Sequence, residues 1–125
     1  MQYLIMILII SGLAVSDVIT GWIKAHLQND YSSKAMRTGL YHKTAEFALM
    51  CTACGLEYGM ELLGNYYQSP ELAHVAGSVT AFSVFIYITV MEIISIFENF
   101  AEINPQAEWA VRFIRKLRNF DDTKK

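Results

Sequence analysis

Residues 72–97 read LAHVAGSVTAFSVFIYITVMEIISIF, and this apolar run decides the fold. Its strongly polar members are His74 near one end and Glu92 near the other. As a helix that rises about 1.5 Å per residue, the run is roughly 39 Å long, which exceeds the roughly 30 Å of a bilayer core. The run therefore predicts a membrane-spanning helix.

Residues 3–23 form a second apolar run, interrupted only by small residues and Asp17. The preceding residues lack the positive charge of a signal peptide, and the run is longer than the apolar part of such a peptide. We therefore expect a retained first span. If that span ends near Val15, Asp17 is instead the N-cap of an amphipathic helix in the connector.

Residues 44–64 are helical by composition but carry Glu46, Glu57 and Glu61. Insertion scales assign roughly +2.5 to +3.5 kcal/mol to an acidic residue in the middle of a membrane. At 100° per residue these three share one side of the helix, here called the acidic arc, with other residues: Met50, Ala53 and Gly64. We expect a third span whose acidic arc faces a protein interior, a partner helix or water.

The positive charges are segregated. Apolar residues make up 54% of the chain, and all ten Lys and Arg residues fall in the connector 24–43 or in the tail from Arg112 onward, whereas 65–71 contains none. Basic flanks stay cytoplasmic, so the chain should have its N-terminus outside and its C-terminus inside. The predicted membrane-surface residues are Lys24, Lys34, Arg37, Lys43, Arg112, Arg115, Lys116 and Arg118.

Asn104-Pro105 has the pattern of a helix start, and residues 105–120 place apolar side chains mostly opposite basic ones. Such a helix rests in the plane of an anionic membrane surface, or else packs on its neighbours through the same apolar side. The predicted fold is therefore an all-α membrane protein, a single domain over 1–125 with three transmembrane helices and a C-terminal amphipathic helix.

The connector and the segment after the last span carry a family pattern. It consists of Asp17, Gly21, Lys24-Ala25, Ser32-Ser33-Lys34, Met36-Arg37, Gly39-Leu40 and Lys43, followed by Glu98-Asn99-Phe100-Ala101-Glu102. With this pattern the chain resembles the phage holin and toxin-secretion holin family. The resemblance implies a homo-oligomer in the bacterial cytoplasmic membrane that opens lesions for an endolysin or a toxin, with an antiholin as a further partner.

The membrane carboxylates are the candidate pore or assembly residues: Asp17, Glu46, Glu57, Glu61 and Glu92. Cys51 and Cys54 form a C-x-x-C, but a zinc site needs four ligands and no second cysteine pair exists in the sequence. We expect no cofactor, no metal, no nucleic acid and no enzymatic activity. Two alternatives stay open, a small membrane enzyme of diacylglycerol-kinase size and a cation-coupled transporter.

The charge count yields a topology prediction. In a chain whose native cysteines are replaced by Ser, Ser69→Cys should react with a membrane-impermeant thiol reagent added outside intact cells, because 65–71 faces outward. Lys34→Cys should react only after permeabilisation. A Ser69→Cys chain that reacts only from the cytoplasm would contradict the three-span topology.

Overall fold

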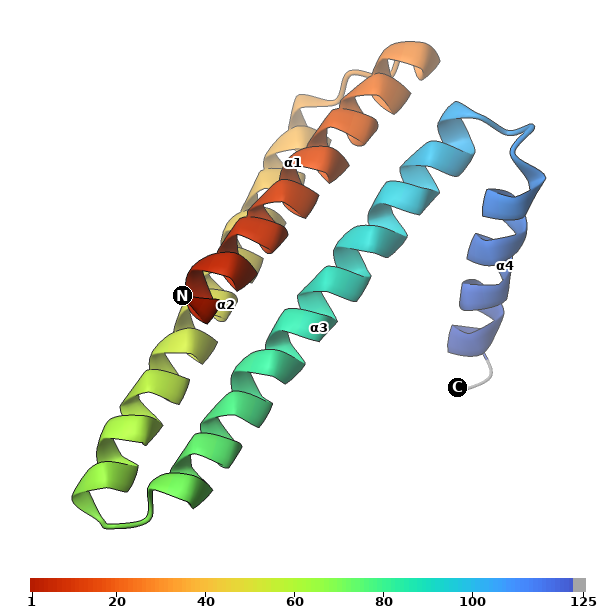
Figure 1. Ribbon diagram of the computed structural model, residues 1–125. Coiled ribbons are helices and arrows are strands. Elements are labelled where there is room, and N and C mark those ends of the chain that lie inside the picture. The colour runs from red at the N-terminus through yellow and green to blue at the C-terminus, as the bar shows by residue number, and fades with distance from the viewer. Residues whose placement is uncertain (123–125) are drawn as a thin grey trace.

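The computed structural model describes residues 1–122, apart from the side chains at 117, 118 and 120–122. The described chain is helical, with short connections (Figure 1). Its helices are α1 (Gln2–Gln28), α2 (Ser33–Tyr66), α3 (Pro70–Ile103) and α4 (Glu108–Asp122).

Local sequence explains where the long helices end. Asn29 caps α1 in the left-handed conformation, with φ at 53°, which Asn tolerates better than most residues. The Ser32 hydroxyl accepts a hydrogen bond from the Ala35 backbone N–H at 3.2 Å and thereby starts α2. Pro70 occupies the first turn of α3, where its missing N–H is tolerated. These short connections make consecutive helices antiparallel.

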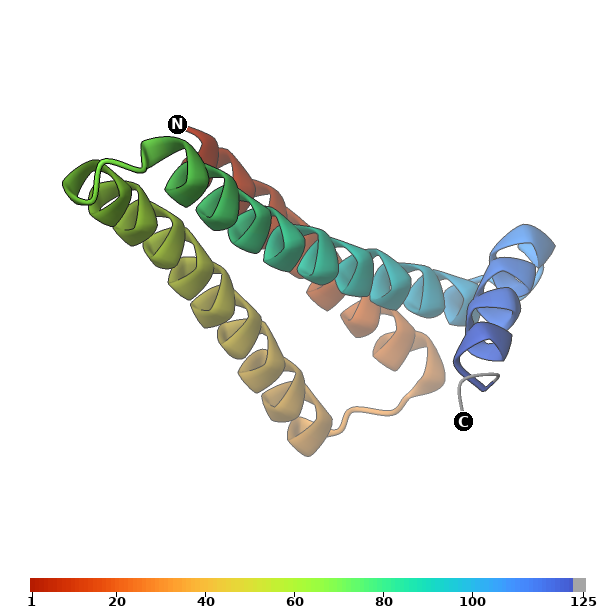
Figure 2. The same ribbon diagram turned by 90° about the horizontal axis from the view of Figure 1, so that it is seen from below.

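The bundle is organised around α3, which contacts α1, α2 and α4, whereas α1 and α2 contact each other least. A small apolar core of Ile10, Met50, Cys54 and Ile88 lies between the three long helices. Figure 2 shows α2 and α3 close together at their shared turn and diverging toward the connection between α1 and α2. Any side chain that joins α2 to its neighbours at the wide end must therefore be long.

Large apolar side chains cover the outside of the bundle rather than its centre. Leu8 and Val18 of α1, and Phe82 and Tyr87 of α3, are more than half exposed. Contiguous exposed apolar surface on this scale indicates contact with lipid or with other protein. By length and composition α1 and α3 can each cross a membrane, and α2 is not among the described helices that pass this test.

The helix boundaries correct parts of the sequence interpretation. The connector 24–43 contains the end of α1 and the first turns of α2, because α2 begins at Ser33 rather than near Thr44. Asn104 is not an N-cap: its backbone N–H bonds to the Phe100 carbonyl at the end of α3, and α4 begins at Glu108. The Asn-Pro pattern here terminates one helix instead of starting the next.

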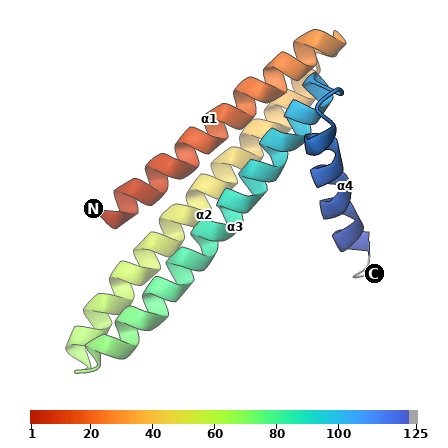
Figure 3. The ribbon, with the colours of Figure 1, turned by 45° about the vertical axis from the view of Figure 1, so that its right-hand side comes forward.

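The tail helix α4 leaves the end of α3 at an oblique angle and points back along the bundle (Figure 3). Its apolar side rests partly on α3, since Trp109 packs edge-to-face against Phe97 and at a tilt against Phe100, and Phe113 packs edge-to-face against Phe97. Trp109 is nevertheless 59% exposed and Phe113 44%. The helix α4 therefore packs on a neighbour, as one of the two predicted modes requires, and its contact with a membrane surface stays a prediction.

The close approach of α2 and α3 predicts a specific sensitivity to side-chain size. A Cβ at Gly64 would lie 2.3 Å from the Ala73 Cβ, whereas a Cβ at Gly55 would meet nothing within 4 Å. Gly64→Ala should lower the free energy of unfolding by about 1 to 3 kcal/mol, as overpacking does. Gly55→Ala should be neutral or slightly stabilising, because Ala favours helix. Denaturant unfolding in detergent micelles measures both, and equal effects would contradict this packing.

Candidate functional site

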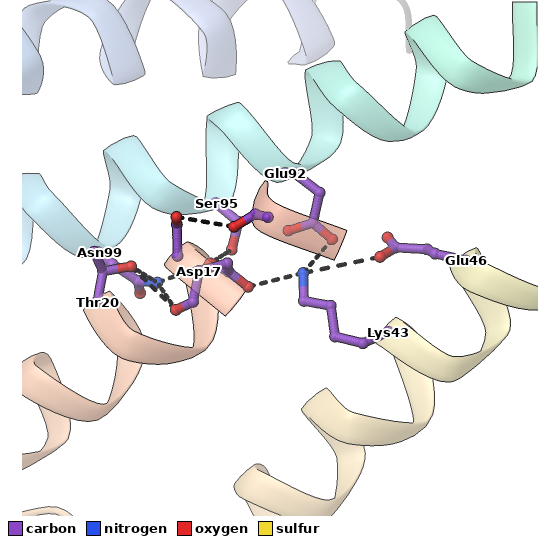
Figure 4. A network of polar contacts seen from close by, with 9 residues as sticks. Asp17, Thr20, Lys43, Glu46, Glu92, Ser95 and Asn99 are labelled. Atoms are coloured by element: carbon purple, nitrogen blue, oxygen red, sulfur yellow. Dashed lines mark hydrogen bonds and ion pairs between the residues drawn. The ribbon is translucent and has the colours of Figure 1, made fainter. Parts of the chain in front are cut away.

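A polar centre lies inside the bundle, where all three long helices meet (Figure 4). Lys43 of α2 supplies the positive charge, and its Nζ lies 2.8 Å from Asp17 Oδ2 on α1 and 2.5 Å from Glu92 Oε1 on α3. Glu46, one turn further along α2, lies 3.8 Å from the same Nζ. The side chain of Lys43 is 16% exposed and that of Glu92 only 1%, so this ammonium joins three helices away from solvent.

Asp17 has the most hydrogen-bond partners of the carboxylates in the polar centre. Besides Lys43, its Oδ1 accepts hydrogen bonds from Ser95 Oγ at 2.6 Å and from Asn99 Nδ2 at 2.9 Å. Asn99 Nδ2 also reaches the hydroxyl of Thr20 at 3.2 Å. Charged acceptors strengthen such bonds, and together these donors replace the water that a buried carboxylate loses.

Sequence spacing places these groups. Glu92, Ser95 and Asn99 are separated by three and four residues, so they occupy one side of α3. Lys43 and Glu46 share a side of α2 for the same reason. Because α2 diverges from α3 at this level, the long Lys side chain suits the gap better than a short donor would.

A second polar contact lies toward the opposite end of α1. Glu57 of α2 is 1% exposed, and its Oε1 accepts hydrogen bonds from Gln2 Nε2 and Ser78 Oγ, both at 3.1 Å. Gly77 of α3 permits this approach, since a Cβ there would lie 3.0 Å from the Glu57 Cα. Three helices again meet at a carboxylate, here through neutral donors.

Contacts at the two ends of the bundle are more exposed. Near the end of α1, Lys24 Nζ lies 3.0 Å from Glu102 Oε1, and Gln28 Nε2 donates to Glu102 Oε2 at 3.2 Å. At the α2–α3 turn, Glu61 Oε1 lies 3.0 Å from His74 Nδ1. Glu61 therefore belongs to the hairpin end and does not join the polar centre.

These contacts set the register between the helices. The pairs Gln2–Glu57 and Asp17–Lys43 place residues 3–23 of α1 beside roughly residues 36–56 of α2. The α2 segment level with the predicted first span therefore starts about eight residues earlier than the predicted 44–64. By this register Lys43 lies well inside the bundle, and Glu57 lies near the N-terminal end of α1.

The helical wheel and the contacts agree on which side of α2 faces the other helices, but they differ on how deep Lys43 lies in the bundle. Met50, Ala53, Glu57 and Gly64 are buried, so the acidic arc does face the other helices, as predicted. Lys43, expected at the membrane surface, is instead the hub of the polar centre. Ser95 and Asn99 were not among the predicted pore or assembly residues, although their spacing from Glu92 was the available signal.

The other basic residues that the structure describes are peripheral. Lys34 and Arg37 are exposed on the first turns of α2, and Arg112, Arg115 and Lys116 are exposed on α4. Arg112 pairs with Glu108 at 3.0 Å within α4. The side chain of Arg118 lies outside the described residues. Cys51 is exposed and Cys54 buried, both as free thiols. Within the described residues, no group of three or more His, Cys, Asp and Glu is arranged to hold a metal ion.

Comparison with known proteins identifies a family. A model of the bacteriophage holin family matches residues 1–119. This range is nearly the whole chain, and it includes every residue whose contacts are described above. No curated protein and no solved structure matches the chain.

Removing the Lys43 charge should destabilise the bundle far more than removing a peripheral charge. Lys43→Gln leaves Asp17 and Glu92 buried without their ammonium partner, and breaking a buried ion pair in this way costs about 3 to 5 kcal/mol. Lys24→Gln is the matched control, because its partly exposed pair with Glu102 contributes about 0 to 1 kcal/mol. Unfolding in micelles compares the two, and similar losses would refute a special role for Lys43.

Proposed function

The chain belongs to the bacteriophage holin family, and from that premise we propose that it oligomerises in the bacterial cytoplasmic membrane and opens lesions through which an endolysin or a toxin crosses. The observation that carries the proposal is the polar centre. Its charged groups pair with one another inside a bundle whose outer surface is apolar, so one chain is compatible with lipid until the bundle opens.

Packing supports three membrane spans. The helices α1 and α3 are each long and apolar enough to cross a bilayer, and α2 packs along α3. A bilayer crossed by both apolar helices therefore also contains the middle of α2. Basic residues gather at the end of the bundle where α1 meets α2 and in α4, which favours a cytoplasmic location for that end and an outward α2–α3 turn.

The cost of burying charge explains a closed state. Roughly 2.5 to 3.5 kcal/mol per ionised residue opposes insertion, so Asp17, Lys43, Glu46 and Glu92 left unpaired would together add on the order of 10 kcal/mol. Pairing with Lys43 relieves part of this cost within one subunit. In an open assembly, water relieves it instead, and the same groups line or approach the lesion. The polar centre thus permits two states, one dry and one wet.

The outer side of α2 supports self-association. Gly55 is exposed and Gly59 partly exposed, and a Cβ at either would meet nothing within 4 Å. Small residues let transmembrane helices approach closely, and large apolar side chains are exposed on all three long helices. A homo-oligomer built through α2 would also bring several polar centres near one another.

The tail helix is assigned to the cytoplasmic membrane surface. Trp109 and Phe113 keep apolar surface free, and three described basic residues are exposed on the same helix: Arg112, Arg115 and Lys116. Basic residues near an anionic surface contribute about 1 kcal/mol each. Replacing all three with Gln should release the tail to added protease in vesicles containing anionic lipid, and unchanged protection would exclude the assignment.

A small membrane enzyme and a cation-coupled transporter are the competing functions. Both would use membrane carboxylates, as the polar centre does. They differ from a holin in their effect on a host: an enzyme or transporter should be tolerated when expressed in growing bacteria. Abrupt growth arrest with loss of the membrane potential would favour the holin.

Vesicle release tests the proposed function directly. In vesicles loaded with a small dye and a folded protein, the purified chain should release both cargoes once its density is sufficient. Lys43→Gln should act at lower density, because it weakens the closed bundle, whereas Lys24→Gln should match the unmodified chain. Release of the dye alone would indicate an ion-sized pore, and release of neither would refute lesion formation.

A further inference from the structure

The polar centre holds more negative groups than positive ones. Asp17, Glu46 and Glu92 supply three carboxyl groups, and Lys43 supplies the one ammonium group that the described residues bring into contact with them. Lys24, the next cation along α1, is paired with Glu102 at the end of the bundle. With every carboxyl group ionised, a centre enclosed by three helices would carry a net charge of −2, which a low-dielectric interior opposes strongly.

The partners of each carboxyl group locate the excess charge. Asp17 is satisfied by Lys43, Ser95 and Asn99. Glu92 is different: its side chain is 1% exposed, Lys43 contacts Oε1, and Oε2 is buried with no hydrogen-bond partner among the described residues. Glu46 Oε2 is likewise buried without a hydrogen bond in that part of the chain, since Lys43 is 3.8 Å away. The unmatched negative charge therefore lies on Glu46 and Glu92.

The two glutamates face each other across α2 and α3, and both approach the same Lys43 ammonium, at 2.5 Å from Glu92 and 3.8 Å from Glu46 (Figure 4). Two carboxylates are both acceptors, so they repel when ionised and bond only when one of them carries a proton. The remaining neighbours do not supply that donor: Lys43 Nζ is too far from Glu46 Oε2 for a hydrogen bond, at 3.8 Å, and Ser95 and Asn99 donate to Asp17. The buried Thr89 hydroxyl of α3 makes no hydrogen bond among the described residues, so it does not donate to either glutamate. A metal ion is also unsuited, because the described residues form no metal-binding group here.

We propose that Glu46 and Glu92 form a proton-binding site that holds one shared proton between α2 and α3 in the closed subunit at neutral pH. One glutamate then donates to the other, and the charge of the centre falls from −2 to −1. Asp17 and Lys43 remain an ion pair beside it. Loss of the proton would set two anions against each other at the level where α2 and α3 diverge. The inference concerns the closed subunit and does not depend on lesion formation.

Infrared spectroscopy of the full chain in lipid vesicles tests this site. The unmodified chain at neutral pH should show the C=O stretch of a protonated carboxyl group, shifted in D₂O and amounting to one group per chain. Glu92→Gln and Glu46→Gln should each abolish that signal, because the new amide N–H₂ donates to the remaining carboxylate and replaces the proton. Either variant suffices if the other fails to fold, and circular dichroism establishes which variants are folded.

Two further variants serve as controls. Glu61→Gln, at the exposed hairpin end, should leave the signal intact. Glu57→Gln separates the other buried carboxyl group, which bonds to Gln2 and Ser78. Absence of the signal from the unmodified chain would overturn the proposal, as would its loss only in Glu57→Gln. Persistence of the signal in any folded variant of Glu46 or Glu92 would also overturn it, because the proton would then not be shared by the pair.

Discussion

The burial of one ammonium group among carboxyl groups from three helices is the constraint on which this structure depends. Without Lys43, α1 and α3 would each present a buried acidic residue to the bundle, and α2 would lose its ionic contact with both helices. The apolar core is small, so it leaves much of the specificity of assembly to polar contacts. Pairing of Lys43 with both Asp17 and Glu92 fixes which helices meet and at what register.

The same arrangement gives the protein two kinds of surface, an apolar one outside the bundle and a charged one inside it. Outward side chains on α1 and α3 suit lipid, while the charged groups suit water or one another. A bundle that satisfies its charges internally is compatible with a dry membrane. Under the proposed function, a neighbouring copy that separated α2 from α3 would expose the same charges to water, and this hydration would favour the open state. In that proposal, the stability of the closed subunit and its readiness to open depend on one cluster.

Periodicity in the sequence was sufficient to predict which side of a helix faces the bundle, but not how far along the bundle a residue lies. The apolar runs identified the helices now labelled α1 and α3, and the wheel correctly predicted that Met50, Ala53, Glu57 and Gly64 face other helices. It was not sufficient to place Lys43, because a basic residue at the end of a connector is ordinarily solvated, and only contacts with α1 and α3 reveal that α2 is shifted inward. The prediction that Asn104 is an N-cap failed for a related reason. Asn suits both ends of a helix, and only the backbone hydrogen bonds show that Asn104 ends α3.

A double-mutant cycle on Lys43 and Glu92 tests this account most directly. Unfolding free energies would be measured in the same micelles for Lys43→Met, Glu92→Met and the double variant. A buried pair that organises the bundle predicts strong non-additivity: Lys43→Met leaves both Asp17 and Glu92 without an ammonium partner, whereas in the Glu92→Met background it leaves Asp17 alone, so the loss caused by Lys43→Met should be smaller there. Losses that simply add would contradict the account, because the two residues would then contribute independently of their contact.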